Sequence, residues 1–124
     1  MTDIESFEDL ESWQNARTIV NSIYNLTSDH KFDRDYSLID QLRRSATSIM
    51  SNIAEGFAHE SSNEFRRYLF IAKSSDAEAQ SQLYIAKDQN YIEEEAFHDL
   101  YDQLDHVSRQ ISNHIKYLKR NQHN

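Results

Sequence analysis

The chain has 124 residues and a formal net charge of −8, and this length suits one domain that buries roughly two thirds of its unfolded surface. The acidity argues against a protein whose whole surface binds nucleic acid, and the absence of cysteine excludes disulfides and thiolate chemistry. No stretch approaches the about 18 consecutive apolar residues of a membrane span, and the acidic residues 1–12 do not resemble a secretory signal. We therefore expect a cytoplasmic protein.

The first half of the chain predicts two long helices. Proline is absent and glycine occurs once, and both residue types interrupt helices. A helix over about 7–28 is predicted by apolar residues at helical spacing, namely Leu10, Trp13, Ala16, Val20 and Ile23. A second helix, over about 37–57, is predicted by Leu38, Leu42, Ala46, Ile49 and Ile53, and Gly56 lies near its end as a helix-terminating residue.

The second half predicts two further helices. Ser61 followed by Glu64 fits a capping box at the start of a helix over about 62–89, whose apolar stripe comprises Phe65, Leu69, Ala72, Ala79, Leu83 and Ala86. Three glutamates begin a helix over about 93–120, where the helix dipole favours anions, and its stripe comprises Phe97, Leu100, Leu104, Val107, Ile111 and Ile115. Four helices with short connections predict an all-α, antiparallel up-down four-helix bundle, a single domain spanning residues 1–124.

A polar stripe runs beside the apolar stripe of the second helix. We interpret it as a seam where another helix or another subunit packs, formed by Gln41, Ser45, Ser48, Asn52, Glu55 and Gly56. A buried Asn must be hydrogen-bonded, so such a seam would also fix the register of packing. The alternative is a ligand or catalytic pocket around Ser48, Asn52 and Glu55, but Ser48 has no histidine or lysine at helical spacing to activate it.

Two patterns could hold a metal, and we expect neither to do so. Four-helix bundles bind two metals through paired Glu-x-x-His motifs, and the chain has one such motif, Glu95 to His98. His98, Asp102 and His106 follow one another at i, i+4 and i+8, among acids that should keep this face solvated. We predict no metal, no cofactor and no enzymatic activity.

The strongest basic pairs are Arg43-Arg44 and Arg66-Arg67. They could contact phosphates on one shared surface, or they could pair with nearby acids such as Asp40, Glu55 and Glu64, which is the interpretation that we favour. The basic residues Lys116, Lys119 and Arg120 complement the negative end of the last helix.

Thirteen tyrosines and phenylalanines raise the question of base stacking with single-stranded nucleic acid. Most of them fall on or beside core stripes, so core packing or subunit contact is the better interpretation. The aromatic residues one position off a stripe are candidates for an oligomer interface, and they are Tyr84, Tyr91 and Tyr117.

The segment QLRRSATSIMSNIAEG, Gln41 to Gly56, carries a family resemblance that also covers Trp13, Ala16, Glu64-Phe65 and Leu69. It resembles the four-helix-bundle proteins encoded within intervening sequences of bacterial 23S ribosomal RNA genes, a family that includes Avd, the accessory variability determinant of diversity-generating retroelements. The chain departs from the family pattern at Met50, where proline is frequent, and at Ser74, where glycine is frequent.

The resemblance implies a ring-shaped homopentamer around a central channel and no settled biochemical activity. Avd is basic and binds nucleic acid and a reverse transcriptase, whereas this chain is acidic. We therefore expect a non-enzymatic, homo-oligomeric assembly or adaptor protein, whose partners are its own copies and another protein. The alternative is a nucleic-acid-binding accessory protein that acts with a reverse transcriptase or in ribosomal RNA processing.

Overall fold

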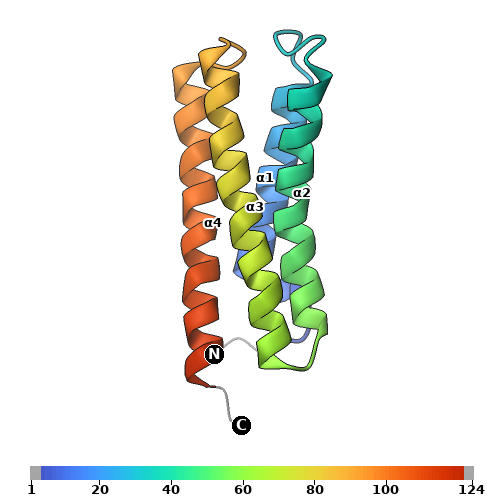
Figure 1. The fold of residues 1–124 in the computed structure, drawn as a ribbon, viewed down its shortest axis with the longest axis vertical. Coiled ribbons are helices and arrows are strands. Elements are labelled where there is room, and N and C mark those ends of the chain that lie inside the picture. Colours follow the sequence, from blue (N-terminus) through green and yellow to red (C-terminus); the bar gives the residue numbers. More distant parts are fainter. Residues whose placement is uncertain (1–3, 122–124) are drawn as a thin grey trace.

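The computed structural model describes residues 4–121. Its elements are a 3-10 turn η1 (Phe7–Asp9) and four helices, α1 (Glu11–Thr27), α2 (Tyr36–Ala58), α3 (Ser62–Asp88) and α4 (Glu94–Arg120). Figure 1 shows the helices side by side with alternating direction. Each helix packs against the next one in the chain, and α1 packs against α4. No strand occurs within the described residues, so the fold is all-α, as predicted.

The first predicted helix is divided near its start. Leu10 is extended (φ −76°, ψ 124°) and separates η1 from α1. The side chain of Asp9 explains the break, because its carboxylate accepts hydrogen bonds from the backbone N–H groups of Glu5 (3.0 Å) and Ser6 (3.1 Å). Such local bonds from an aspartate compete with a continuous helix. The other three helices begin and end within one residue of the predicted bounds.

Polar side chains and one left-handed residue fix the helix ends. Asp35 accepts from the N–H of Leu38 at the start of α2 (3.1 Å), and Ser61 accepts from the N–H of Glu64 at the start of α3 (3.4 Å). At the end of α3, Asn90 has φ 64°, and the N–H of Tyr91 reaches the carbonyl of Ala86 (2.9 Å). This is a Schellman ending with asparagine in the position that glycine usually takes.

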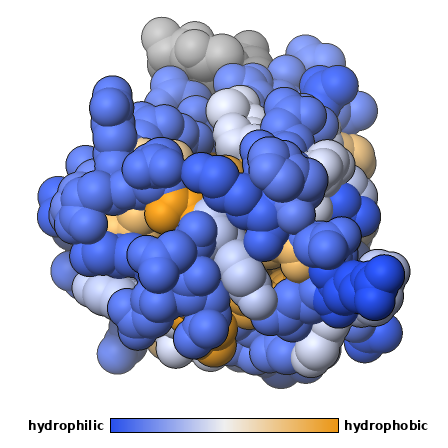
Figure 2. All heavy atoms as spheres, turned by 90° about the horizontal axis from the view of Figure 1, so that it is seen from above, coloured by the Kyte–Doolittle hydropathy of each residue, from blue (hydrophilic) through white to orange (hydrophobic). Residues whose placement is uncertain are grey.

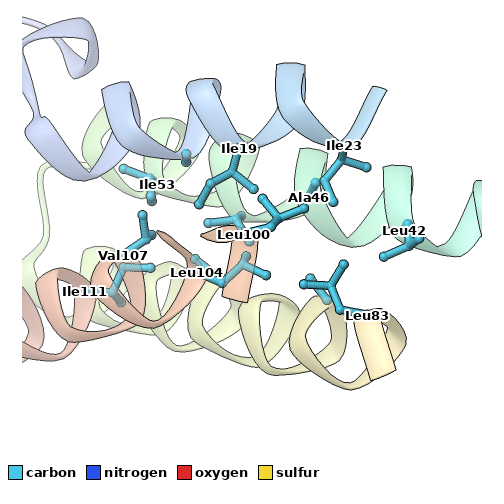
Figure 3. Packing of buried hydrophobic residues seen from close by; sticks show 14 of the residues in the cluster. Ile19, Ile23, Leu42, Ala46, Ile53, Leu83, Leu100, Leu104, Val107 and Ile111 are labelled. Carbon is cyan, nitrogen blue, oxygen red and sulfur yellow. The ribbon is translucent and has the colours of Figure 1, made fainter. Parts of the chain in front are cut away.

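The core lies along the axis of the bundle, where aliphatic side chains from all four helices point toward one another (Figure 3). Its fully buried members include Ile19, Ile23, Leu42, Ala46, Ile49, Ile53, Leu69, Leu83, Leu104, Val107 and Ile111. Burying one such Leu, Ile or Val side chain contributes about 1.5–3 kcal/mol. All of these except Ile19 are residues of the predicted stripes, so the 3.6-residue period is what places the core. In α1 the stripe was predicted to include Val20, whereas Ile19 is the buried residue and Val20 is half-buried. Within residues 4–121, no helix is both long and apolar enough to cross a membrane.

Side chains join the two loops at one end of the bundle. Phe32, from the α1–α2 loop, is buried against the ring of Tyr91 (centroids 5.1 Å apart), and the Tyr91 hydroxyl donates to Asp35 (3.0 Å). The ammonium of Lys31 lies 3.0 Å from the carboxylate of Glu93. Seen from this end, the surface is mostly hydrophilic, and hydrophobic residues show only in the gaps between polar ones (Figure 2).

Candidate interaction surfaces

The polar stripe of α2 faces α3 inside the chain. Ser45 donates to the amide oxygen of Gln82 (2.9 Å), and the hydroxyls of Ser48 and Ser75 share a hydrogen bond of 2.7 Å. The amide of Asn52 donates to the backbone carbonyl (2.8 Å) and the hydroxyl (3.0 Å) of Ser48. The polar groups of the stripe are therefore satisfied by α2 itself and by its neighbouring helix.

Gly56 belongs to the same contact, near the other end of α2. It does not terminate the helix, as was predicted, because α2 continues to Ala58 and Gly56 does not have the positive φ of a terminating glycine. A β-carbon at this position would lie 2.8 Å from Cδ1 of Phe65 and 2.9 Å from Cβ of Tyr68, both on α3. The two remaining residues of the predicted seam, Gln41 and Glu55, are exposed. Four of the six predicted residues thus form or support the contact of α2 with α3, and contact with another subunit through this stripe stays a prediction.

The arginine pairs lie at opposite ends of the bundle, because Arg43 and Arg44 lie in the first half of α2 and Arg66 and Arg67 lie at the start of the antiparallel α3 (Figure 1). Within one chain they therefore do not form one shared surface. Arg43 donates to the hydroxyl of Thr27 (2.9 Å) and covers the ring of Tyr24, on α1. These contacts bind α2 to α1.

Two further arginines pair with acids on their own helices, as the favoured interpretation predicted. Arg44 lies 2.9 Å from Asp40, and Arg67 lies 3.1 Å from Glu64. The hydrogen bond from Arg67 lowers the pKa of the Glu64 carboxyl. Both pairs are exposed, so they contribute little to stability.

Arg66 instead belongs to a basic groove between α3 and α4 that the sequence analysis did not find. The groove has a volume of about 390 Å³, and its lining comprises Arg66, Phe70, Lys73, Ser112, Ile115, Lys116 and Lys119. None of these residues is acidic, in a chain whose net charge is −8. The antiparallel order of α3 and α4 brings the two lysine-bearing segments together, a pairing that helix-by-helix reasoning from the sequence could not supply.

The histidine pattern of α4 does not gather into a site. His98 shares a hydrogen bond with Glu94 (3.2 Å) near the start of the helix. Asp102 and His106 line a different groove, of about 260 Å³, against Asn15 of α1. Over the part of the chain that the structure describes, no group of three or more His, Asp or Glu side chains is placed to hold a metal ion.

The outward side of α3 exposes several large hydrophobic side chains to solvent. We call it the α3 outer face, and it comprises Phe70, Ile71, Ser74, Ala77, Glu78, Ser81, Tyr84 and Ile85. Its large hydrophobic side chains are 38–52% exposed, and they are four of the eight that are exposed within residues 4–121. Its middle carries small side chains, and Glu78 is its one charged member.

Of the off-stripe tyrosines, Tyr84 lies on the α3 outer face, where its ring also contacts Phe97 of α4 (4.9 Å). Tyr117 is exposed on α4. Tyr91 instead packs against Phe32 and donates a hydrogen bond to Asp35. Tyr84 was predicted from its position one residue off the core stripe, whereas Phe70, Ile71 and Ile85 were not predicted. The sequence does contain a signal for these residues. The core needs apolar residues on one side of α3, whereas this helix also carries them on the opposite side.

One acidic residue is buried on the inward side of α3. Asp76 is 0% exposed, and neither of its carboxylate oxygens has a hydrogen-bond partner among the described residues. Burial, with a smaller contribution from the charge of Asp105, raises the pKa of the Asp76 carboxyl to about 7.

The structure is an all-α four-helix bundle. Its candidate interaction surfaces are the basic groove between α3 and α4 and the α3 outer face, whereas the polar stripe of α2 packs against α3. Over residues 8–113, the sequence matches the family described as 23S rRNA-intervening sequence protein, and the chain belongs to that family. The resemblance drawn from the Gln41–Gly56 segment is thereby confirmed.

A solved structure is similar in fold. It is a protein of unknown function from the S23 ribosomal protein family of Bacteroides thetaiotaomicron, with a TM-score of 0.76 and 22% sequence identity, over 85% of this chain and 95% of that chain. No curated protein matches the sequence.

Proposed function

We propose that the protein is a non-enzymatic assembly protein of the cytoplasm, in which identical copies associate through the α3 outer face. The observation that carries this proposal is the exposure of Phe70, Ile71, Tyr84 and Ile85 on one side of one helix. Large hydrophobic side chains left exposed together on one side of a helix commonly mark an interaction site. Here they form two pairs, Phe70 with Ile71 and Tyr84 with Ile85, with small side chains between them. Burying these pairs against a second copy would remove them from water, which is the main driving force of association.

The composition of the α3 outer face suits contact between helices. Ser74, Ala77 and Ser81 occupy its middle, and small side chains let two helix axes approach closely. Glu78 is the one charged side chain on the face, so the face brings little charge into a contact. In a ring of five it would pack against a different surface of the next copy, because ring contacts are heterologous. The family resemblance adds a copy number, a ring of five around a channel, and the surfaces left outside the ring would remain available to a protein partner.

Native mass spectrometry of the wild-type protein and of Ala77→Arg tests this proposal. Ala77 is exposed at the centre of the α3 outer face, so the arginine should block association while leaving the helix content unchanged. Asn21→Arg, at an exposed position of α1, is the control with the same added charge. We expect a five-fold mass for the wild type and for Asn21→Arg, and the mass of a single chain for Ala77→Arg.

Two results would contradict the proposal in different ways. A wild-type protein that is monomeric at micromolar concentration would overturn the assembly function itself. An Ala77→Arg protein that keeps the five-fold mass would leave the assembly intact and remove the α3 outer face as its contact.

The basic groove favours a second candidate function, that of a nucleic-acid-binding accessory protein acting with a reverse transcriptase or in ribosomal RNA processing. Four cationic side chains converge there around the exposed ring of Phe70, a combination that suits phosphates and a stacked base. The net charge of −8 opposes such binding at long range.

Fluorescence anisotropy with single-stranded RNA separates the candidates. If the groove binds RNA, Lys116→Ala/Lys119→Ala should lose affinity, and wild-type affinity should fall steeply with salt. Arg43→Ala/Arg44→Ala removes the same charge elsewhere and should change little. The assembly proposal expects no measurable RNA binding by any of the three proteins.

A further inference from the structure

The carboxyl group of Asp76 has no role in the proposed assembly, yet it occupies a place that is unfavourable for an acid. It lies on the inward side of α3, fully buried, and both of its oxygens lack a hydrogen-bond partner within residues 4–121. An ionised carboxylate in such a place loses its hydration without compensation, and buried charges are normally paired. The neutral acid avoids most of this penalty.

The helices that pack against α3 offer Asp76 no cation. On the α2 side, Ser48 bonds to Ser75, the neighbour of Asp76 in the chain, and Ser45 bonds to Gln82, six residues further along α3. Neither serine titrates. On the α4 side, the facing groups are the carboxylate of Asp105 and the phenol of Tyr101.

The charges nearest to these groups do not reach Asp76 either. Asp105 is itself paired with Arg109 at 2.7 Å. The charged neighbours on α3, Lys73 and Glu78, are exposed. The surroundings of Asp76 are therefore apolar, neutral or negative.

We propose that Asp76 is a proton-operated switch in the contact between α3 and α4: the neutral acid allows the two helices to pack, and loss of its proton to solvent opens the contact around it. This inference concerns the single chain, so it does not depend on the proposed assembly. Asp76 and the α3 outer face lie on opposite sides of the same turns of α3, so opening the inward contact would also disturb the outward surface.

The pH range of the switch follows from the two states of the chain. The pKa of Asp76 is raised from its ordinary value of 3.8 to about 7 by burial and by Asp105. Well below pH 4 both the folded and the unfolded chain hold the proton, and Asp76 then adds no pH dependence to folding. Between about pH 4 and 7 the unfolded chain loses the proton and the folded chain keeps it, so stability falls as pH rises. The separation of the two pKa values corresponds to a roughly thousand-fold decrease in the folding equilibrium constant.

Urea unfolding across pH 4–8.5 compares the wild type with Asp76→Asn, which keeps the shape of the side chain and removes the titration. We expect the wild-type folding constant, divided by that of the variant, to fall about a thousand-fold over this range. Asp105→Asn is the control, and it should keep most of the fall, because burial is the larger cause of the shift. Protein concentration is held constant, since association adds to apparent stability. A ratio that does not change with pH would overturn the proposal.

A direct titration keeps the proposal testable if Asp76→Asn fails to fold. The carboxyl carbon of Asp76, followed by ¹³C NMR in the wild-type protein, should titrate with a midpoint near pH 7, and a midpoint near pH 4 would overturn the proposal.

Hydrogen exchange, corrected for its intrinsic dependence on pH, then locates the opening. Amides of residues 72–80 and 101–108 should exchange faster above pH 7 than below it, while those of α1 should not. An equal increase in all four helices would contradict a local switch.

Discussion

The ring of Phe65 lies directly against the backbone of Gly56, at the end of the bundle where α2 turns into α3. A β-carbon on Gly56 would come within 2.8 Å of that ring. The same ring also meets the imidazole of His114 edge to face, with centroids 4.7 Å apart. Because Gly56 has no side chain, α2 and α3 can approach closely at this end of the bundle. The ring of Phe65 fills the space beside Gly56 and also contacts α4 through His114.

Gly56→Ala should destabilise the fold although alanine is the better helix former. The intrinsic helix preference favours alanine by about 1 kcal/mol, but the new methyl group meets Cβ of Tyr68 at 2.9 Å, an atom that moves only with its backbone. Overpacking of this kind typically costs about 1–3 kcal/mol, so we expect a net loss in urea unfolding. Ser51→Ala, at an exposed site of α2, is the control and should be neutral or stabilising. A Gly56→Ala protein as stable as the control would show that α3 can retreat without loss.

The hydrogen bond between Ser48 and Ser75 should contribute measurably to the α2–α3 contact. Its oxygens are 2.7 Å apart in a part-buried position, where a neutral hydrogen bond contributes about 0.5–1.5 kcal/mol. A double-mutant cycle with Ser48→Ala and Ser75→Ala, followed by urea unfolding, isolates this coupling. The same cycle on the exposed pair Ser37 and Gln41 should give a smaller value. Equal couplings in the two cycles would mean that solvent competes for the buried pair as well.

His114 should make the protein less stable in mild acid. Burial lowers the pKa of its imidazole from 6.5, so as pH falls through about 6.5 the unfolded chain takes up a proton before the folded chain does. The unfolded state is then favoured, and this loss continues until the pH reaches the lowered pKa of the folded state. His114→Gln should remove this dependence of the unfolding free energy on pH.

The opposing titration of Asp76 would obscure this effect, so the comparison is made in an Asp76→Asn background. Unfolding free energies at pH 5 and pH 7.5 should differ when His114 is present and agree more closely when it is replaced. An identical difference in both proteins would assign the acid sensitivity to other groups.

The sequence predicts the helices well because the information is local. Apolar spacing within one helix determines which side is buried, and Ser61 begins α3 as its type and position predict. The sequence does not show which helix packs against each surface of another helix. The stripe of Ser45, Ser48 and Asn52 was correctly placed beside the core line, yet only the packed bundle reveals that α3 is the helix it meets.

The missed features share the same cause. Arg66 is adjacent to Arg67 in sequence, but consecutive helix residues point about 100° apart, so one pairs with Glu64 and the other joins lysines about 50 residues away. The burial of Asp76 could have been predicted from the sequence. The predicted stripe of α3 passes from Ala72 to Ala79, and the helical position between them, which a core residue should occupy, holds an acid.

The order in which the helices pack has a consequence for the time course of assembly. Each helix meets the one that follows it in the chain. The contacts between distant segments include that of α1 with α4, marked by the 3.0 Å bond from Asn15 to Gln110, and that between the two loops, where Tyr91 bonds to Asp35. Helical proteins with mostly local contacts fold in about microseconds to milliseconds. Encounters between copies at micromolar concentration, with association rate constants of about 10⁵–10⁷ M⁻¹s⁻¹, take about 0.1–10 s. For the proposed assembly, the slow step is therefore the meeting of finished bundles, and its half-time should shorten in proportion as the protein is made more concentrated.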